Sequence, residues 1–151
     1  MTTTTAGPSN DRAHEALVRQ FYVPFNTGEV ELYDAILAPD WVDDPLAPGQ
    51  RSGPGGLKDL VAQFRAAVPD YHVINDEILV AGDRVAGDRV AVHSTVRGTH
   101  REAFFGVPAT GRPVTLRTCD FHRIAGGVIV VTWHLEDFFA FLQQVGALPT
   151  R

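Results

Sequence analysis

Three segments in the first half of the chain carry apolar residues every three or four positions. This spacing places apolar side chains on one face of a helix. Pro39 and Pro69 end the second and third patterns, because proline interrupts the hydrogen bonding of a helix. The predicted helices cover residues 13–25, 30–37 and 57–68, and residues 41–43 are predicted to be extended.

Beyond Tyr71 the pattern changes from helical to alternating. Valine, isoleucine and threonine become frequent, and glycine-containing turns separate four runs, which is typical of β-strands. Three helices followed by four strands predict an α+β domain with an antiparallel, curled sheet that the helices cover on one side. The predicted strands are 71–85, 89–100, 112–124 and 127–137, and residues 138–149 add a last helical turn or two.

Length and composition indicate one globular domain. The 151 residues are 44% hydrophobic and 21% charged, which is ordinary for a folded domain. We expect residues 12–151 to form this domain and residues 1–11 to be a disordered polar lead-in. The net charge of −5 comes without a basic cluster, so nucleic acid and anionic membranes are not expected partners.

The lack of a recognisable targeting signal and the single cysteine indicate a cytoplasmic protein. The start of the chain lacks the basic and apolar regions of a secretory signal, and no stretch has the length of a membrane span. Cys119 is the only cysteine, so the chain has no internal disulfide. We therefore expect a cytoplasmic protein.

The pentapeptide AGDRV occurs twice in succession, at residues 81–90. Side chains alternate with period two along a strand, so an insert of five residues inverts the two faces unless a bulge or a loop absorbs it. We expect a longer hairpin or a bulge here. A neutral duplication in an exposed loop is the simpler explanation.

Two acids and two histidines fall within the last two predicted strands. Alternation puts Thr118, Asp120 and His122 on one face of the strand 112–124. If the curled sheet encloses a cavity, Asp120 and His122 point into it, together with one of the two acids that end the next strand.

In the last strand, the same alternation separates Trp133 from His134 and Glu136. We assign His134 and Glu136 to the solvent side, while His134 is kept among the candidate substrate contacts. A tryptophan in such a strand, as Trp133 is, is more often a core residue than part of a substrate-binding wall.

A carboxyl group in an apolar cavity suits proton transfer. Loss of water disfavours the charged form and raises the pKa toward neutrality, and a neighbouring imidazole can orient the acid. Structural explanations stay open for both residues: Asp120 could pair with Arg97 or Arg117, and His122 could be a hydrogen-bonded core histidine.

Metal binding and nucleophilic catalysis find little support. The histidines are scattered and form no motif with metal-ligand spacing. The chain has no GxSxG elbow, and Cys119 has no evident electropositive setting. We expect no metal and no other cofactor.

Five short motifs then follow one another in the second half of the chain: RGTH, GVPATGR, DFHRI, GG-I and W-x-x-x-D. With the order of helices and strands, they make residues 13–149 resemble the SnoaL-like polyketide cyclases, also called ester-cyclase-like proteins, of the NTF2-like superfamily. This resemblance implies an NTF2-like cone, in which three N-terminal helices cover one face of a strongly curved mixed or antiparallel sheet.

The resemblance also implies an activity. Characterised members close a ring of a polyketide by cofactor-free intramolecular aldol condensation, with an aspartate as general acid and base. Asp120 and Asp137 occupy the acidic positions of the matching pattern, and His122 lies where a supporting histidine can sit. The doubled AGDRV and the presence of Glu136 beside Asp137 depart from the pattern, and both aspartates stay open as the catalytic acid.

We therefore expect a cyclase of natural-product biosynthesis that closes a ring of an apolar, polyketide-like intermediate. A hydrolase, isomerase or dehydratase on the same scaffold is the enzymatic alternative, and a non-catalytic ligand-binding protein is the other. We also expect a homodimer or higher homo-oligomer through the uncovered sheet face. The candidate catalytic residues are Asp120, Asp137 and His122, and the candidate substrate contacts are Asn26, Phe21, Tyr22, Phe25, Trp41, Phe64, Trp133 and His134.

Overall fold

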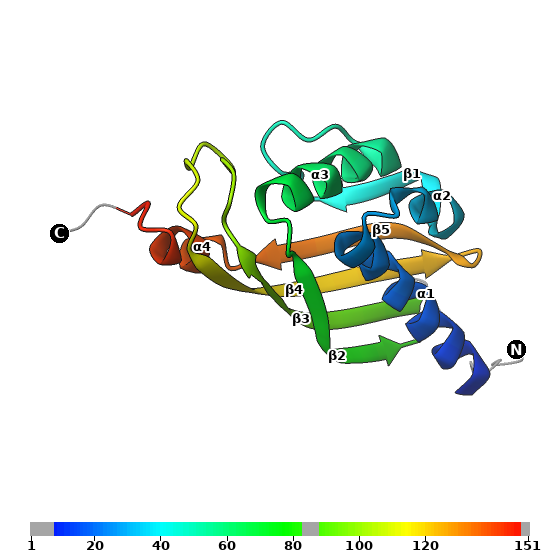
Figure 1. The fold of residues 1–151 in the computed structure, drawn as a ribbon. Helices are drawn as coiled ribbons and strands as arrows, with labels where there is room; N and C mark the ends of the chain where they lie inside the picture. The colour runs from blue at the N-terminus through cyan, green and yellow to red at the C-terminus, as the bar shows by residue number, and fades with distance from the viewer. Residues whose placement is uncertain (1–7, 83–87, 149–151) are drawn as a thin grey trace, which may run out of the picture.

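The computed structural model describes residues 8–82 and 88–148 (Figure 1). Helices dominate the first half of this part and strands the second, as the sequence predicts. The elements are α1 (Pro8–Thr27), a 3-10 turn (Val30–Leu32), α2 (Tyr33–Ile36), β1 (Leu37–Asp44), α3 (Gly53–Ala67), β2 (His72–Ala81), β3 (Asp88–Thr99), β4 (Pro113–Ala125), β5 (Val128–Glu136) and α4 (Phe138–Gln144).

The strands form one mixed sheet in the order β1-β5-β4-β3-β2. Strands β2 to β5 pair antiparallel with their neighbours, whereas β1 pairs with β5 in parallel. The α+β class and the four later strands are confirmed. The predicted extended piece 41–43 proves to be part of a longer edge strand, β1, and Figure 1 shows helices α1 and α3 over the same face of the sheet.

All three predicted helices differ from the structure in their boundaries. Helix α3 begins at Gly53 rather than Leu57, so its first turn lies in the proline- and glycine-rich segment. Helix α1 begins at Pro8 rather than near Arg12, which is compatible with proline because the first turn of a helix needs no N–H donor there. The second predicted helix, 30–37, shrinks to a turn and the short α2, since Leu37 already pairs with Ile129 in the sheet.

The apolar faces of the helices and the inner face of the sheet share one core. Val18, Phe21 and Tyr22 of α1 pack there with Leu57 and Val61 of α3. A second, smaller cluster around Phe141 joins α4 to the start of β4. Figure 1 shows α4 beside the loop between β3 and β4, at one end of the sheet.

A β-bulge in β5 decides which side chains face the helices. The β4–β5 pairing passes from Arg123↔Val131 to Ile124↔Ile129, so one residue of β5, Val130, has no partner in the ladder. An extra residue inverts the alternation beyond it. Ile129 and Thr132 are therefore both buried, and the inner face continues from Thr132 through every second residue to the end of the strand.

Two sequence features lie wholly or partly outside the described residues. Half of the duplicated AGDRV segment falls on residues 83–87, and most of the predicted lead-in falls on residues 1–7. Within the described part of the chain, no helix combines the length and the apolar character that crossing a membrane requires.

Candidate active site

A cavity of about 630 Å³ lies between the helices and the inner face of the sheet. This volume is typical of sites for small organic ligands. Apolar side chains make up most of the lining. Its aromatic residues include Phe21 and Phe25 from α1, Phe64 from α3, Phe104 and Phe105 from the loop before β4, and Phe138 and Phe141 from α4.

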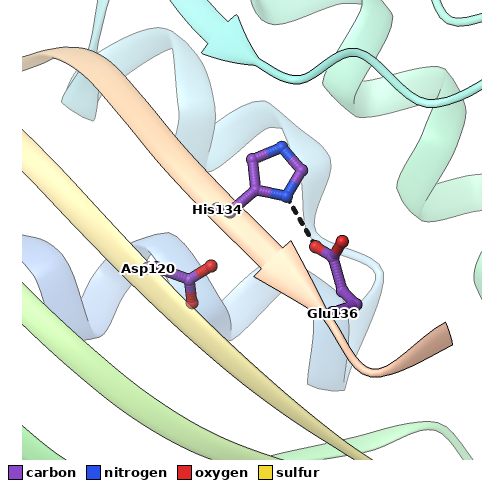
Figure 2. Close-up of side chains that lie close together, drawn as sticks. All are labelled: Asp120, His134 and Glu136. Atoms are coloured by element: carbon purple, nitrogen blue, oxygen red, sulfur yellow. Dashed lines mark hydrogen bonds and ion pairs between the residues drawn. The ribbon is translucent and has the colours of Figure 1, made fainter. Parts of the chain in front are cut away.

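Polar side chains of the lining gather where β4, β5 and β1 lie next to one another. Asp120 on β4 is directly opposite His134 on β5, and Thr118 is opposite Glu136. Figure 2 shows Asp120, His134 and Glu136 on the same side of these strands. Asp43, from the edge strand β1, completes this polar end of the cavity.

Asp120 is buried, with 6% of its surface exposed. Its Oδ2 accepts a hydrogen bond of 2.7 Å from the Tyr22 hydroxyl and a longer one of 3.4 Å from Thr118. Burial raises the pKa of Asp120 to about 6, the Tyr22 hydrogen bond opposes that rise, and the charge of Glu136 adds to it. A carboxyl with this pKa can both donate and accept a proton near neutral pH.

Behind Asp120, a chain of hydrogen bonds runs into the core. Tyr22 Oη lies 3.0 Å from His122 Nε2, and His122 Nδ1 lies 3.0 Å from the Thr132 hydroxyl. Trp41 Nε1 donates to the same hydroxyl at 3.1 Å. Burial lowers the pKa of His122 to about 3, so this imidazole is neutral.

Only one arrangement of protons satisfies this chain while Asp120 is ionised. Tyr22 must donate to the carboxylate, so His122 donates to Tyr22 from Nε2 and accepts from Thr132 at Nδ1. Thr132 in turn accepts from Trp41, which can only donate. The chain therefore fixes the tautomer of His122 and points every donor toward Asp120.

His134 has the opposite environment. Its Nδ1 lies 2.6 Å from Glu136 Oε1, and its Nε2 lies 3.1 Å from Asp43 Oδ1. Burial disfavours the charge, but the hydrogen bonds to Asp43 and Glu136 outweigh it and raise the pKa of His134 to about 10. Gln50 holds the other oxygen of Asp43 at 2.7 Å. His134 is thus an imidazolium between two carboxylates.

Among the described side chains, Asp120, His134 and Glu136 come closest to a metal-binding arrangement. One potential ligand atom each from Asp120, His134 and Glu136 lies within 4.8 Å of the others. An imidazole nitrogen needs a free lone pair to bind a metal, and both nitrogens of His134 face carboxylates. This pairing favours a proton, rather than a metal ion, on His134.

The structure brings part of the predicted site together. Asp120 and His134 line the cavity, with the predicted contacts Phe21, Tyr22, Phe25 and Phe64. His122 and Trp41 lie behind the lining, in the hydrogen-bonded chain. The assignment of His134 and Glu136 to the solvent side is wrong, because the bulge in β5 turns both side chains inward.

Three other candidates lie away from the cavity. Trp133 is on the outer face of the sheet, 36% exposed, under the guanidinium of Arg89, again because of the bulge. Asn26 bonds the backbone N–H and C=O of Val73, which ties α1 to β2. Asp137 caps α4 by accepting a hydrogen bond from the backbone of Ala140.

Sequence reasoning missed Asp43 and the partners of His134. Asp43 lies on β1, far from β5 in the sequence, and only the parallel pairing of these strands brings it to His134. Glu136 faces the cavity because of the bulge in β5. The run of valine and isoleucine in that strand contains no residue, such as glycine, that would indicate a bulge.

The free energy of unfolding of Asp120→Asn, compared with that of wild type, should increase as the pH rises. Folding raises the pKa of Asp120 from 3.8 to about 6, so the folded protein holds this proton more tightly than the unfolded chain. The contribution of Asp120 to the free energy of unfolding is complete below about pH 4 and is lost as the pH rises through about 6.

The variant lacks this loss, so its free energy of unfolding relative to wild type should rise by about 2–3 kcal/mol between pH 4 and pH 7. Urea unfolding of both proteins at the two pH values measures the difference. A difference that stays constant would contradict the raised pKa.

Comparisons with known proteins agree with this architecture. TsrD from Streptomyces laurentii superposes with a TM-score of 0.80 at 23% identity, over 91% of this chain and 97% of that one. A protein of Bacillus cereus ATCC 10987, provisionally assigned as a polyketide cyclase, gives a TM-score of 0.80 at 26% identity, over 95% and 87%. IdmH from Streptomyces antibioticus, with the same provisional assignment, gives 0.73 at 29%, over 87% and 97%.

Among curated protein sequences, none matches the chain significantly. The sequence profile of one family matches residues 16–145, which include most of α1, all of α3 and all five strands. The chain therefore belongs to the SnoaL-like polyketide cyclase family.

Proposed function

We propose that this protein is a cyclase that closes a ring of an apolar, polyketide-like intermediate by intramolecular aldol condensation, with Asp120 exchanging protons with the substrate. Membership of the SnoaL-like family supports a role of the polyketide-cyclase type. The observation that carries the finer proposal is the setting of Asp120: it is buried in an apolar cavity, hydrogen-bonded to Tyr22, with a pKa of about 6.

The cavity fits such a substrate. Its aromatic walls match fused rings, which gain contact and lose water there. The polar end of the cavity at β4 and β5 holds Asp120, so an oxygen-bearing part of the substrate would be directed to that residue. The substrate's own conjugation would spread the enolate charge, so that proton transfer and positioning supply the chemistry.

A role in ligand binding alone has weaker support. It would be favoured if the acids of the cavity were bridged to arginines. Asp120 instead accepts hydrogen bonds from the neutral side chains of Tyr22 and Thr118, which leave it able to gain or lose a proton.

Ring closure can be tested with a diketone probe. We define it as a tricyclic aromatic compound with one aryl-CH2-C(=O) group as the carbon acid and a second ketone placed to close a six-membered ring. Wild-type protein should accelerate closure over buffer, and Asp120→Asn should lose on the order of 10²–10⁴ of the rate. Product formation is followed by mass spectrometry, and full activity of a folded Asp120→Asn variant would refute the proposal.

The same reaction run in ¹⁸O-labelled water separates the enzymatic rivals. Aldol closure takes no oxygen from solvent, whereas hydrolysis or epoxide opening does. Label in the product beyond the level seen in buffer would favour the rivals.

The outer face of the sheet supports a homodimer as a further part of the proposal. Phe121 and Trp133 pair across β4 and β5, next to Leu135, which is 72% exposed. Exposed apolar patches of this kind usually mark protein contacts, and this patch lies on the face away from the cavity. A second copy of the chain is the proposed partner.

Light scattering coupled to gel filtration should show a dimer for wild type and a shift to monomer for Leu135→Lys, since a charge there would be buried at the contact. A wild-type protein that is monomeric at micromolar concentration would contradict this contact.

The proposal places the enzyme in the cytoplasm, where the exposed thiol of Cys119 stays reduced.

A further inference from the structure

A second carboxyl group, that of Glu136, lies within reach of the same substrate atoms as Asp120. Glu136 faces the cavity from the end of β5, one diagonal step from Asp120 on β4. Potential ligand atoms of Asp120, His134 and Glu136 all lie within 4.8 Å of one another. Figure 2 shows the Glu136 carboxylate joined to His134, with Asp120 across from both.

The two carboxyl groups have different partners. Asp120 is almost fully buried, and its nearest partner is the neutral hydroxyl of Tyr22 at 2.7 Å. The Glu136 side chain is 44% exposed and lies 2.6 Å from an imidazole that Asp43 also holds. A neighbouring cation stabilises the charged carboxylate, whereas burial stabilises the protonated form and, at Asp120, outweighs the opposing hydrogen bond from Tyr22.

Nearby carboxyl groups with different surroundings divide the roles of acid and base. Their mutual repulsion strengthens the division, because placing both charges within a few ångströms is unfavourable. The His134 cation also lies within 4.8 Å of Asp120 and favours its charged form, but burial outweighs this effect. Asp120 is therefore the group suited to hold the proton, and Glu136 is the carboxylate in direct contact with the cation.

We propose that Glu136 is the base that removes the C–H proton, that Asp120 is the acid that protonates the new alkoxide, and that His134, held by Asp43, positions Glu136. This inference rests on the function proposed above and assigns the two proton transfers to separate groups. His134 does not touch the reacting atoms in this scheme, because both of its nitrogens are engaged.

The steps balance. The C–H proton moves to Glu136, and the electron pair of that bond forms the enolate. The enolate carbon attacks the second carbonyl carbon, a C–C bond forms, and the carbonyl oxygen takes the proton of Asp120. Transfer of one proton from Glu136 back to Asp120, across the short gap between them, restores the starting state.

The diketone probe in D₂O reports the two transfers separately, since loss of the aryl-CH2 proton signal in NMR measures the base and ring closure measures the whole reaction. Glu136→Gln should lose both exchange and closure by about 100-fold or more. Asp120→Asn should keep exchange within about 10-fold of wild type and lose closure. Glu29→Gln, an exposed carboxylate change outside the cavity, is the matched control and should keep both.

The outcomes distinguish this inference from the function on which it rests. If Asp120→Asn loses exchange as completely as Glu136→Gln, or if Glu136→Gln keeps exchange, the division of roles is wrong and the cyclase proposal survives. If wild-type protein catalyses neither exchange nor closure, the cyclase proposal fails and this inference with it. Thermal unfolding verifies that each variant is folded. Glu136→Asp keeps a carboxylate but on a shorter side chain, farther from the substrate, and should show an intermediate exchange rate.

The positioning role of His134 has its own readout. His134→Gln should lower kcat for exchange about 10-fold or more with little change in KM, because the probe still binds while the base is misplaced. His134→Lys restores a positive charge and should recover much of kcat. A Gln variant with the wild-type kcat would remove His134 from the scheme.

Discussion

The hydrogen bond between Tyr22 and Asp120 is the interaction on which the site depends. It joins α1 to β4 across the core, and it is the last link of a chain that starts at Trp41 and passes through Thr132 and His122. Every donor in that chain is neutral, so the carboxyl group gains a fixed orientation without gaining a positive neighbour in contact. Burial can then raise its pKa to about 6, which an arginine in the place of Tyr22 would prevent.

The fold supplies the contrasting environment a few ångströms away. The parallel edge strand β1 brings Asp43 to His134, and the loop that follows β1 adds Gln50. Helix α1 thus supplies the partner of Asp120, and β1 supplies Asp43, which holds the partner of Glu136. Two acids in one apolar cavity can have different surroundings because different elements of the fold provide their partners.

Sequence patterns predicted much of this fold but only half of the site. Strict alternation holds along β4, so Thr118, Asp120 and His122 were placed on one face correctly. It fails along β5, where the unpaired Val130 reverses the faces and brings His134 and Glu136 inside. A bulge within a run of similar β-branched residues leaves no trace in the sequence, because its position depends on how the neighbouring strand pairs. The contact of Asp43 with His134 is likewise a tertiary effect that no local pattern encodes.

The central claim is that Asp120 holds its proton close to neutral pH. The most direct measurement is an NMR titration of the ¹³C-labelled side-chain carboxyls, in which the signal missing from Asp120→Asn identifies Asp120. The structure predicts an apparent pKa near 6 for that signal. A midpoint at or below about 4, the ordinary value for an aspartate, would contradict the claim.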